Sequence, residues 1–190
     1  MTLEEFHSQY EIRKLKKGER ITSFSCGDED LDDFILNDAY LYRNALLAIT
    51  YVVEHKDTRQ VSAYFSLAND RITIKDFPDK NAFNRFRRHR FVNEKRLTNY
   101  PAVKLCRFAI DSSLKGQSVG TYLLDFMKSF FVDDNRTGCR FMTVDAYRSA
   151  EPFYGKNGFL YLTNEEQENS KTRLMFFDLI NIEEESSDHQ

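Results

Sequence analysis

Residues 104–132 constrain the fold more than any other part of this chain, because they combine the patterns of a strand, a glycine-containing turn and a helix. In the second half, apolar side chains recur at the i, i+3, i+4 and i+7 spacing of one helix face. They are Val119, Tyr122, Leu123, Phe126, Met127, Phe130 and Phe131. The spacing predicts a helix over residues 119–132.

The turn at residues 115–120 contains two glycines and places Ser118 where a helix N-cap is expected. Backbone N–H groups at a helix start have no intrahelical acceptor, and the helix dipole is positive there. The turn is therefore a candidate phosphate site. An ordinary loop between a strand and a helix is the alternative, and the turn alone does not separate the two.

The composition predicts one packed domain. The chain has 190 residues, of which 41% are apolar and 14% aromatic, which is enough to bury a substantial core. We expect a single domain over residues 1–182 and a disordered acidic tail at residues 183–190. The net charge of −3 argues against binding nucleic acid over the whole surface, but it is compatible with a local basic patch.

The cysteines Cys26, Cys106 and Cys139 are odd in number and lack the paired spacing of a zinc site. We expect buried thiols, without a disulfide framework or a metal site. The N-terminal residues contain no apolar signal region, and no later run reaches membrane-spanning length. These features predict a cytoplasmic protein that does not associate with a membrane.

Hydrophobic patterns along the chain predict an α/β (α+β) fold with a mixed sheet of about six or seven strands flanked by helices. Strands are expected at residues 11–15, 47–54, 61–68, 102–111, 139–146, 159–162 and 172–180, with Pro101 just before the fourth. Further helices are expected at residues 28–45 and 147–157, the latter stopped by Gly158. The helix between the strands at 102–111 and 139–146 predicts a parallel pair with a right-handed crossover.

Residues 80–96 are strongly basic. Their cations include Lys80, Arg85, Arg87, Arg88 and Arg90, interleaved with Phe83, Phe86 and Phe91. In a helix, Phe83, Phe86, Arg87 and Arg90 share one face, so that rings anchor a cationic surface. Such a surface is a candidate RNA contact. The alternative is a solvated helix whose aromatic rings pack into the core.

Two motifs and the order of elements resemble the GNAT superfamily of acetyl-CoA-dependent N-acetyltransferases. Residues 115–120 lie where that family has its pyrophosphate signature, and residues 153–159 are similar to its common FYxKxGF segment. The resemblance spans roughly residues 11–180. Lys115 stands where the family usually has Gln or Arg, and Ser118 stands where it usually has Gly.

Three further segments resemble the branch of this family that contains toxins acetylating the amino group of aminoacyl-tRNA. They are residues 24–27 followed by Leu31, residues 63–67 and residues 105–111. Members of that branch tend to have strongly basic surfaces for tRNA, and here the segment at residues 80–96 is the candidate.

The resemblance implies acetyl-CoA as cofactor and assigns site residues. Along the pantetheine arm they are Phe108, Ala109 and Ile110, and around the pyrophosphate they are Lys115, Gly116, Gln117, Ser118, Val119, Gly120 and Thr121. Tyr154 is the expected general acid, because a phenol with a pKa of about 10 is protonated at neutral pH and can donate to a thiolate.

The resemblance also implies transfer of an acetyl group to a primary amine. We expect a small-molecule or peptide acceptor; the alternatives are aminoacyl-tRNA and a CoA-binding module without turnover. A homodimer is a candidate assembly. No general base is evident, although water with Asp111, Asp145 or Glu151 is a candidate. An α-amine of pKa about 8 is about one-tenth neutral at pH 7, against about one in 2,500 for lysine, so a missing base favours α-amines.

Overall fold

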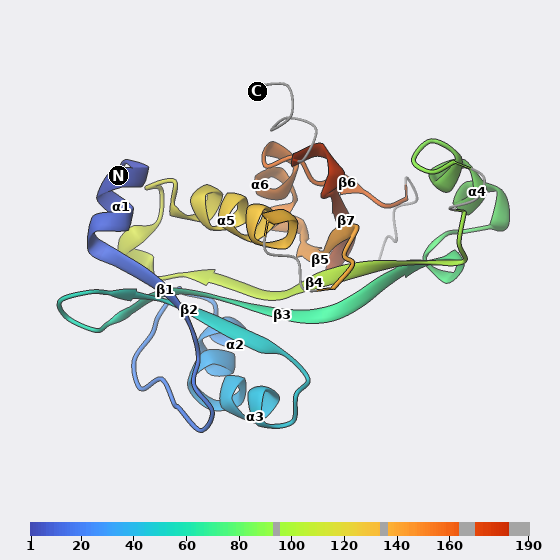
Figure 1. Cartoon of the computed structure of the whole chain (residues 1–190). Helices are drawn as coiled ribbons and strands as arrows, with labels where there is room; N and C mark the ends of the chain where they lie inside the picture. The colour runs from blue at the N-terminus through green and yellow to red at the C-terminus, as the bar shows by residue number, and fades with distance from the viewer. Residues whose placement is uncertain (93–95, 134–136, 164–169, 183–190) are drawn as a thin grey trace. The chain divides into compact units, whose positions relative to one another are not determined.

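The structure is a computed structural model that describes residues 1–92, 96–133, 137–163 and 170–182. Seven strands form one sheet in the order β1-β2-β3-β4-β5-β7-β6 (Figure 1). They are β1 (Tyr10–Lys14), β2 (Ile49–His55), β3 (Val61–Thr73), β4 (Asn99–Ile110), β5 (Phe141–Tyr147), β6 (Leu160–Tyr161) and β7 (Thr172–Asp178). The predicted mixed sheet is confirmed, and the predicted tail lies outside the described residues.

The chain forms two compact units. Unit 1 contains residues 1–68 and 105–127, and unit 2 contains residues 69–104 and the described residues from 128 onward. Strands β3 and β4 and helix α5 (Val119–Asp133) contribute residues to both. Each unit has a hydrophobic cluster of its own.

In unit 1, β2 pairs antiparallel with β1 on one side and with β3 on the other, so that Val53 lies opposite both Ile12 and Ala63. Most of β2 is buried, which suits its apolar and β-branched sequence. The predicted hairpin of residues 47–54 and 61–68 is confirmed. Strand β3 continues beyond the predicted end to Thr73.

The helices before β2 differ from the prediction in two ways. A short helix, α1 (Leu3–Gln9), opens the chain, held by a capping box between Thr2 and Glu5 that the hydrophobic pattern does not reveal. The predicted helix at 28–45 is α2 (Glu29–Asp33), a π-helical turn (Phe34–Asp38) and α3 (Ala39–Asn44). Apolar spacing could not show the π turn, because it reports which residues are buried and not which carbonyl each N–H reaches.

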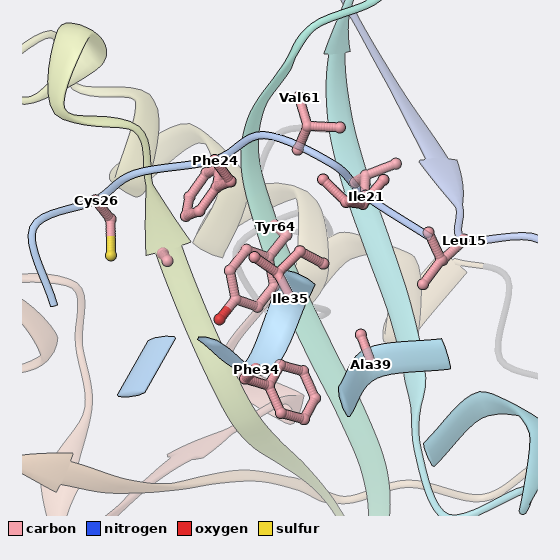
Figure 2. Close-up of a cluster of buried hydrophobic side chains, with 11 residues drawn as sticks. Leu15, Ile21, Phe24, Cys26, Phe34, Ile35, Ala39, Val61 and Tyr64 are labelled. Atoms are coloured by element: carbon pink, nitrogen blue, oxygen red, sulfur yellow. The ribbon is translucent and has the colours of Figure 1, made fainter. Parts of the chain in front are cut away.

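The core of unit 1 lies between these helices and the sheet (Figure 2). Tyr64 on β3 is fully buried, and its ring packs edge-on against Phe24 with a centroid distance of 5.3 Å. Its hydroxyl donates a hydrogen bond to the carbonyl oxygen of Leu31, 2.6 Å away. Strand β3 thereby holds both the segment before α2 and α2 itself.

Helix α5 confirms the predicted amphipathic helix, with one change in its buried face. Val119, Leu123, Leu124 and Met127 are almost fully buried, whereas Phe130 and Phe131 are half-buried. Leu124 is absent from the predicted apolar face. The burial shows that α5 presents a wider face to the core than the i, i+3, i+4 pattern implies.

In unit 2, β7 pairs antiparallel with β5 and with β6, so that Phe176 lies opposite both Thr143 and Leu160. Helix α4 (Lys80–Arg88) begins at its N-cap Asp79, which accepts a hydrogen bond from the N–H of Ala82. Helix α6 (Glu151–Lys156) follows a 3-10 turn (Arg148–Ala150). Gly158 comes just after its C-cap, as predicted.

Other predictions are corrected in detail. Pro101 lies inside β4 and not before it, and its carbonyl accepts a hydrogen bond from the N–H of Arg140. Cys26 is buried, but Cys106 and Cys139 are partly exposed, and all three are free thiols. Among the described residues, no helix is long and apolar enough to cross a membrane, and no three metal-binding side chains gather together.

Candidate functional site

The candidate phosphate turn begins where β4 ends in unit 1. Asp111 anchors this point, since its N–H donates to the carbonyl of Ser62 at 2.9 Å. Its carboxylate accepts from the N–H and the hydroxyl of Ser113, at 3.0 and 2.7 Å, and caps a 3-10 turn (Ser112–Leu114). Leu114 is buried, so the chain is fixed on the core just before residue 115.

Two residues of the turn adopt left-handed backbone conformations. Gly116 has φ +77°, which costs a glycine nothing, and Ser118 has φ +64°, which costs a residue with a Cβ about 1 kcal/mol or more. Ser118 lies at the predicted N-cap position, directly before α5, but the expected side-chain cap is not seen. Its side chain accepts no helical N–H among the described residues, and only its carbonyl oxygen takes part, accepting from the N–H of Tyr122 at 3.1 Å.

The start of α5 leaves several backbone donors free. Within the described part of the chain, no acceptor takes the N–H groups of Ser118, Val119, Gly120 and Thr121. Val119 and Gly120 are buried, and a Cβ built on Gly116 would meet no atom within 4 Å. These free donors lie at the positive end of the dipole of α5, and there is open space beside Gly116. Such an arrangement fits the pyrophosphate of a nucleotide cofactor.

Lys115 does not extend freely from this turn. Its Nζ donates to the carbonyl oxygen of Cys26 at 2.5 Å. Nearby, the N–H of Ser112 donates to the carbonyl of Ser25 at 3.0 Å. The sequence predicts only a turn at residues 24–27 and does not reveal this contact.

The three predicted pantetheine-contacting residues end β4. Ala109 is buried in the core of unit 1, while Phe108 and Ile110 are half-buried. A buried alanine has little side chain to offer, so any ligand contact made by Ala109 comes from its backbone.

Tyr154 lies on α6 in unit 2. Its side chain is 6% exposed and packs against Phe153 and Phe159, with centroid distances of 5.3 and 5.4 Å. Burial raises the pKa of the Tyr154 hydroxyl above its ordinary value, because the phenolate would lose its hydration. The group therefore holds its proton throughout the neutral range and can act only as a donor there.

The candidate bases are all engaged. Asp111 caps the 3-10 turn as described, and Asp145 forms an ion pair with Lys104. Glu151 pairs with Arg148 at 3.2 Å and accepts a hydrogen bond from the hydroxyl of Tyr161 at 2.8 Å. Each of the three carboxylates therefore already has a partner within the protein.

The basic segment divides into two sets of cations. Phe83 and Phe86 are buried, as the alternative interpretation predicts, and the two arginines beside them are partly buried. Arg87 donates to the carbonyls of Arg96 and Leu97, at 3.3 and 3.2 Å. Arg90 lies 4.3 Å from the ring of Phe86. The side chains of Lys80, Arg85 and Arg88 are exposed and available to a partner.

Comparison with known proteins identifies the fold. Residues 89–176 match the family described as acetyltransferase (GNAT) domain. A tyrosine-to-phenylalanine variant of KacT is 25% identical with a TM-score of 0.74, covering 93% of this chain and 98% of that one. AtaT complexed with acetyl-methionyl-tRNAfMet is 24% identical with a TM-score of 0.72, covering 92% and 97%. AtaTR bound with AcCoA is 24% identical with a TM-score of 0.72, covering 93% and 97%. The chain thus has the fold of these structures, and its residues 89–176 match a GNAT acetyltransferase domain.

Proposed function

We propose that this enzyme transfers the acetyl group of acetyl-CoA to the α-amino group of an aminoacyl-tRNA. The free N–H groups at the start of α5 carry the cofactor half of the proposal. The acceptor half is supported by the structural similarity to KacT and to AtaT, which was solved with an acetylated aminoacyl-tRNA. A small-molecule or peptide acceptor, expected from the sequence, has no such support.

Acetyl-CoA supplies an acetyl group activated as a thioester. The backbone N–H groups of residues 118–121 would hold its pyrophosphate, with Gly116 leaving room for the phosphates. Residues 108–110 would run along the pantetheine arm, and a main-chain N–H there would stabilise the developing oxyanion.

Tyr154 would deliver the proton that the leaving thiolate needs. Its buried hydroxyl keeps that proton at neutral pH, and a phenol can donate to a thiolate whose conjugate acid has a pKa of about 8.5. Structures have been solved of variants of KacT and AtaT in which one tyrosine is replaced by phenylalanine.

The acceptor amine would not need a strong base. An α-amino group of pKa about 8 is about one-tenth neutral at pH 7, so it reaches the site already deprotonated in a useful fraction. This agrees with the engagement of Asp111, Asp145 and Glu151 in other contacts. Lys80, Arg85 and Arg88 would contact the RNA phosphates.

The cofactor half is tested by thermal unfolding with acetyl-CoA. At about 100 times its Kd the ligand should stabilise the protein by about 2.7 kcal/mol, and no shift at saturating concentration would overturn the proposal. The acceptor half is tested by incubating the enzyme with acetyl-CoA and charged tRNA, and measuring N-acetylated amino acid after hydrolysis by mass spectrometry. Faster acetylation of peptides or free amines than of charged tRNA would overturn it.

The RNA interaction is tested by a matched pair of variants. Replacing Arg85 and Arg88 together by Ala should weaken tRNA binding and lower the slope of its salt dependence by about 0.7 to 0.9 for each phosphate that the protein no longer neutralises. Arg87→Met is the control, because its guanidinium is already used within the protein. An unchanged salt slope in the double variant would show that this face does not bind the RNA.

A further inference from the structure

We propose that Lys115 is a positioning residue, which braces the phosphate turn against the loop at residues 25–27 and is not itself a ligand of the cofactor phosphates. This inference rests on the proposed function, since it concerns the same acetyl-CoA site. It reverses the role that the family resemblance implies for Lys115.

Two hydrogen bonds join the entry of the phosphate turn to this loop, one donated by the 3-10 turn before it and one by Lys115. Lys115 Nζ reaches the carbonyl oxygen of Cys26 at 2.5 Å, and the N–H of Ser112 reaches the carbonyl oxygen of Ser25 at 3.0 Å. The donors lie on either side of Leu114, which is buried. The beginning of the turn is therefore held at three points in a row.

The loop is fixed from its other side by Asp32 on α2. The Asp32 carboxylate accepts from the N–H of Cys26 at 2.7 Å and from the hydroxyl of Ser25 at 3.4 Å. Cys26 thus accepts from an ammonium through its carbonyl oxygen and donates to a carboxylate through its N–H. Both hydrogen bonds have a charged partner, and such bonds are stronger than those between neutral groups.

Gly27 has a left-handed backbone conformation, which favours glycine. Its φ is +81°, and a Cβ there would lie 3.7 Å from Lys115 Nζ and 3.8 Å from Ser112 Oγ. Figure 2 shows the segment that carries Phe24 and Cys26 alongside the core of unit 1. Lys115 therefore donates its hydrogen bond to a loop backbone that packs against this core.

The brace adds to two hydrogen bonds that Gln117 donates within this region, from its N–H to the carbonyl of Leu114 at 3.4 Å and from its Nε2 to the carbonyl of Ser113 at 3.0 Å. Gly116 and Ser118 are both left-handed, and the N–H groups that follow have no acceptor in the described chain. Fixing the entry of the turn restricts the directions in which these donors can point. Preorganisation of that sort raises affinity by removing the cost of ordering the turn on binding.

The test is a double-mutant cycle on acetyl-CoA binding, measured by calorimetry for Lys115→Met, Asp32→Asn and the double variant. We expect each single variant to raise the Kd by about 3- to 10-fold and the double variant to be no weaker than the weaker single one. With saturating acetyl-CoA, kcat should stay within about two-fold, so that the loss appears in KM. Lys17→Met, which replaces an exposed lysine of the same unit, should bind as the wild type does.

The direction in which Asp32→Asn changes the affinity for acetyl-CoA separates the brace from a simple charge effect. By charge alone, removing a carboxylate near the turn strengthens the binding of an anion, whereas loss of the brace weakens it. Unchanged or tighter binding by Asp32→Asn, or losses that add in the double variant, would overturn the brace. If the wild type does not bind acetyl-CoA, the proposed function fails instead, and the brace is tested by the same cycle on thermal unfolding midpoints, where additive shifts would overturn it.

Discussion

The phosphate turn of unit 1 and the aromatic cluster under α4 in unit 2 use opposite parts of the polypeptide. In the turn, the functional groups are backbone donors, and the side chains that matter act by fixing the backbone. Under α4, the rings of Phe86, Phe141 and Phe176 meet at centroid distances of 5.4 to 5.8 Å, with Arg90 against the first of them. One region thus depends on backbone conformation and the other on side-chain volume.

The largest effect is therefore expected in unit 2. Phe86→Ala should lower the free energy of unfolding by about 3 to 5 kcal/mol, because it empties the centre of a packed aromatic cluster. Chemical denaturation measures this, with Asn81→Ala on the exposed side of α4 as the control. A loss below about 1 kcal/mol would mean that the cluster is not the packed core of unit 2.

The next effect concerns Tyr154, a buried side chain with a chemical role. Tyr154→Phe should lower kcat by about 10²- to 10⁴-fold, since only the proton donor is removed. The ring remains, so the Kd for acetyl-CoA and the unfolding midpoint should stay close to those of the wild type. Steady-state kinetics beside calorimetry separates the two, and an undiminished kcat would take Tyr154 out of the acid role.

In the phosphate turn, replacing one side chain is expected to stabilise the protein. Ser118→Gly is expected to raise the free energy of unfolding by about 0.5 to 1 kcal/mol, because glycine adopts φ +64° without the cost that serine bears. Acetyl-CoA binding should be retained, since the N–H of residue 118 is still present. Destabilisation by this substitution would show that the serine hydroxyl has a contact of its own.

The smallest effect is a pH dependence at the brace. Burial opposes ionisation of Asp32, but hydrogen bonds from Cys26 and Gly27 outweigh it and hold the pKa of Asp32 below its ordinary value. A pKa lowered by folding contributes stability above the unfolded value of about 3.9, which is lost as the pH falls further. The stability difference between wild type and Asp32→Asn should thus shrink between pH 6 and pH 3, and a difference that grows would contradict the direction of the shift.

Much of the fold could be predicted because its signals are local. The hairpin of β2 and β3 and the helix α5 could be predicted because the spacing of their apolar residues indicates which side chains are buried. The stop of α6 before Gly158 is local as well. The order of these elements, with α5 between β4 and β5, indicated the resemblance together with the motifs at residues 115–120 and 153–159.

The rest depended on contacts that no local pattern encodes. Lys115 and Cys26 lie 89 residues apart, and nothing in either neighbourhood predicts that one donates to the other. Arg87 and Arg90 look like surface cations in the sequence, but they pack on rings and carbonyls of their own unit. Ser118 satisfies the sequence rule for a helix cap, although its backbone is left-handed, a conformation that favours glycine.

The left-handed backbone of Ser118 affects how proteins with this turn can be identified from their sequences. Its position in the turn is defined by a dihedral angle, and glycine is only the easiest way to meet it. A motif written as letters scores serine there as a mismatch, while the geometry scores it as a match at a small cost in stability. Divergent members of this superfamily should therefore be sought by asking which residues can tolerate a positive φ ahead of the helix, with asparagine and aspartate next in order after glycine.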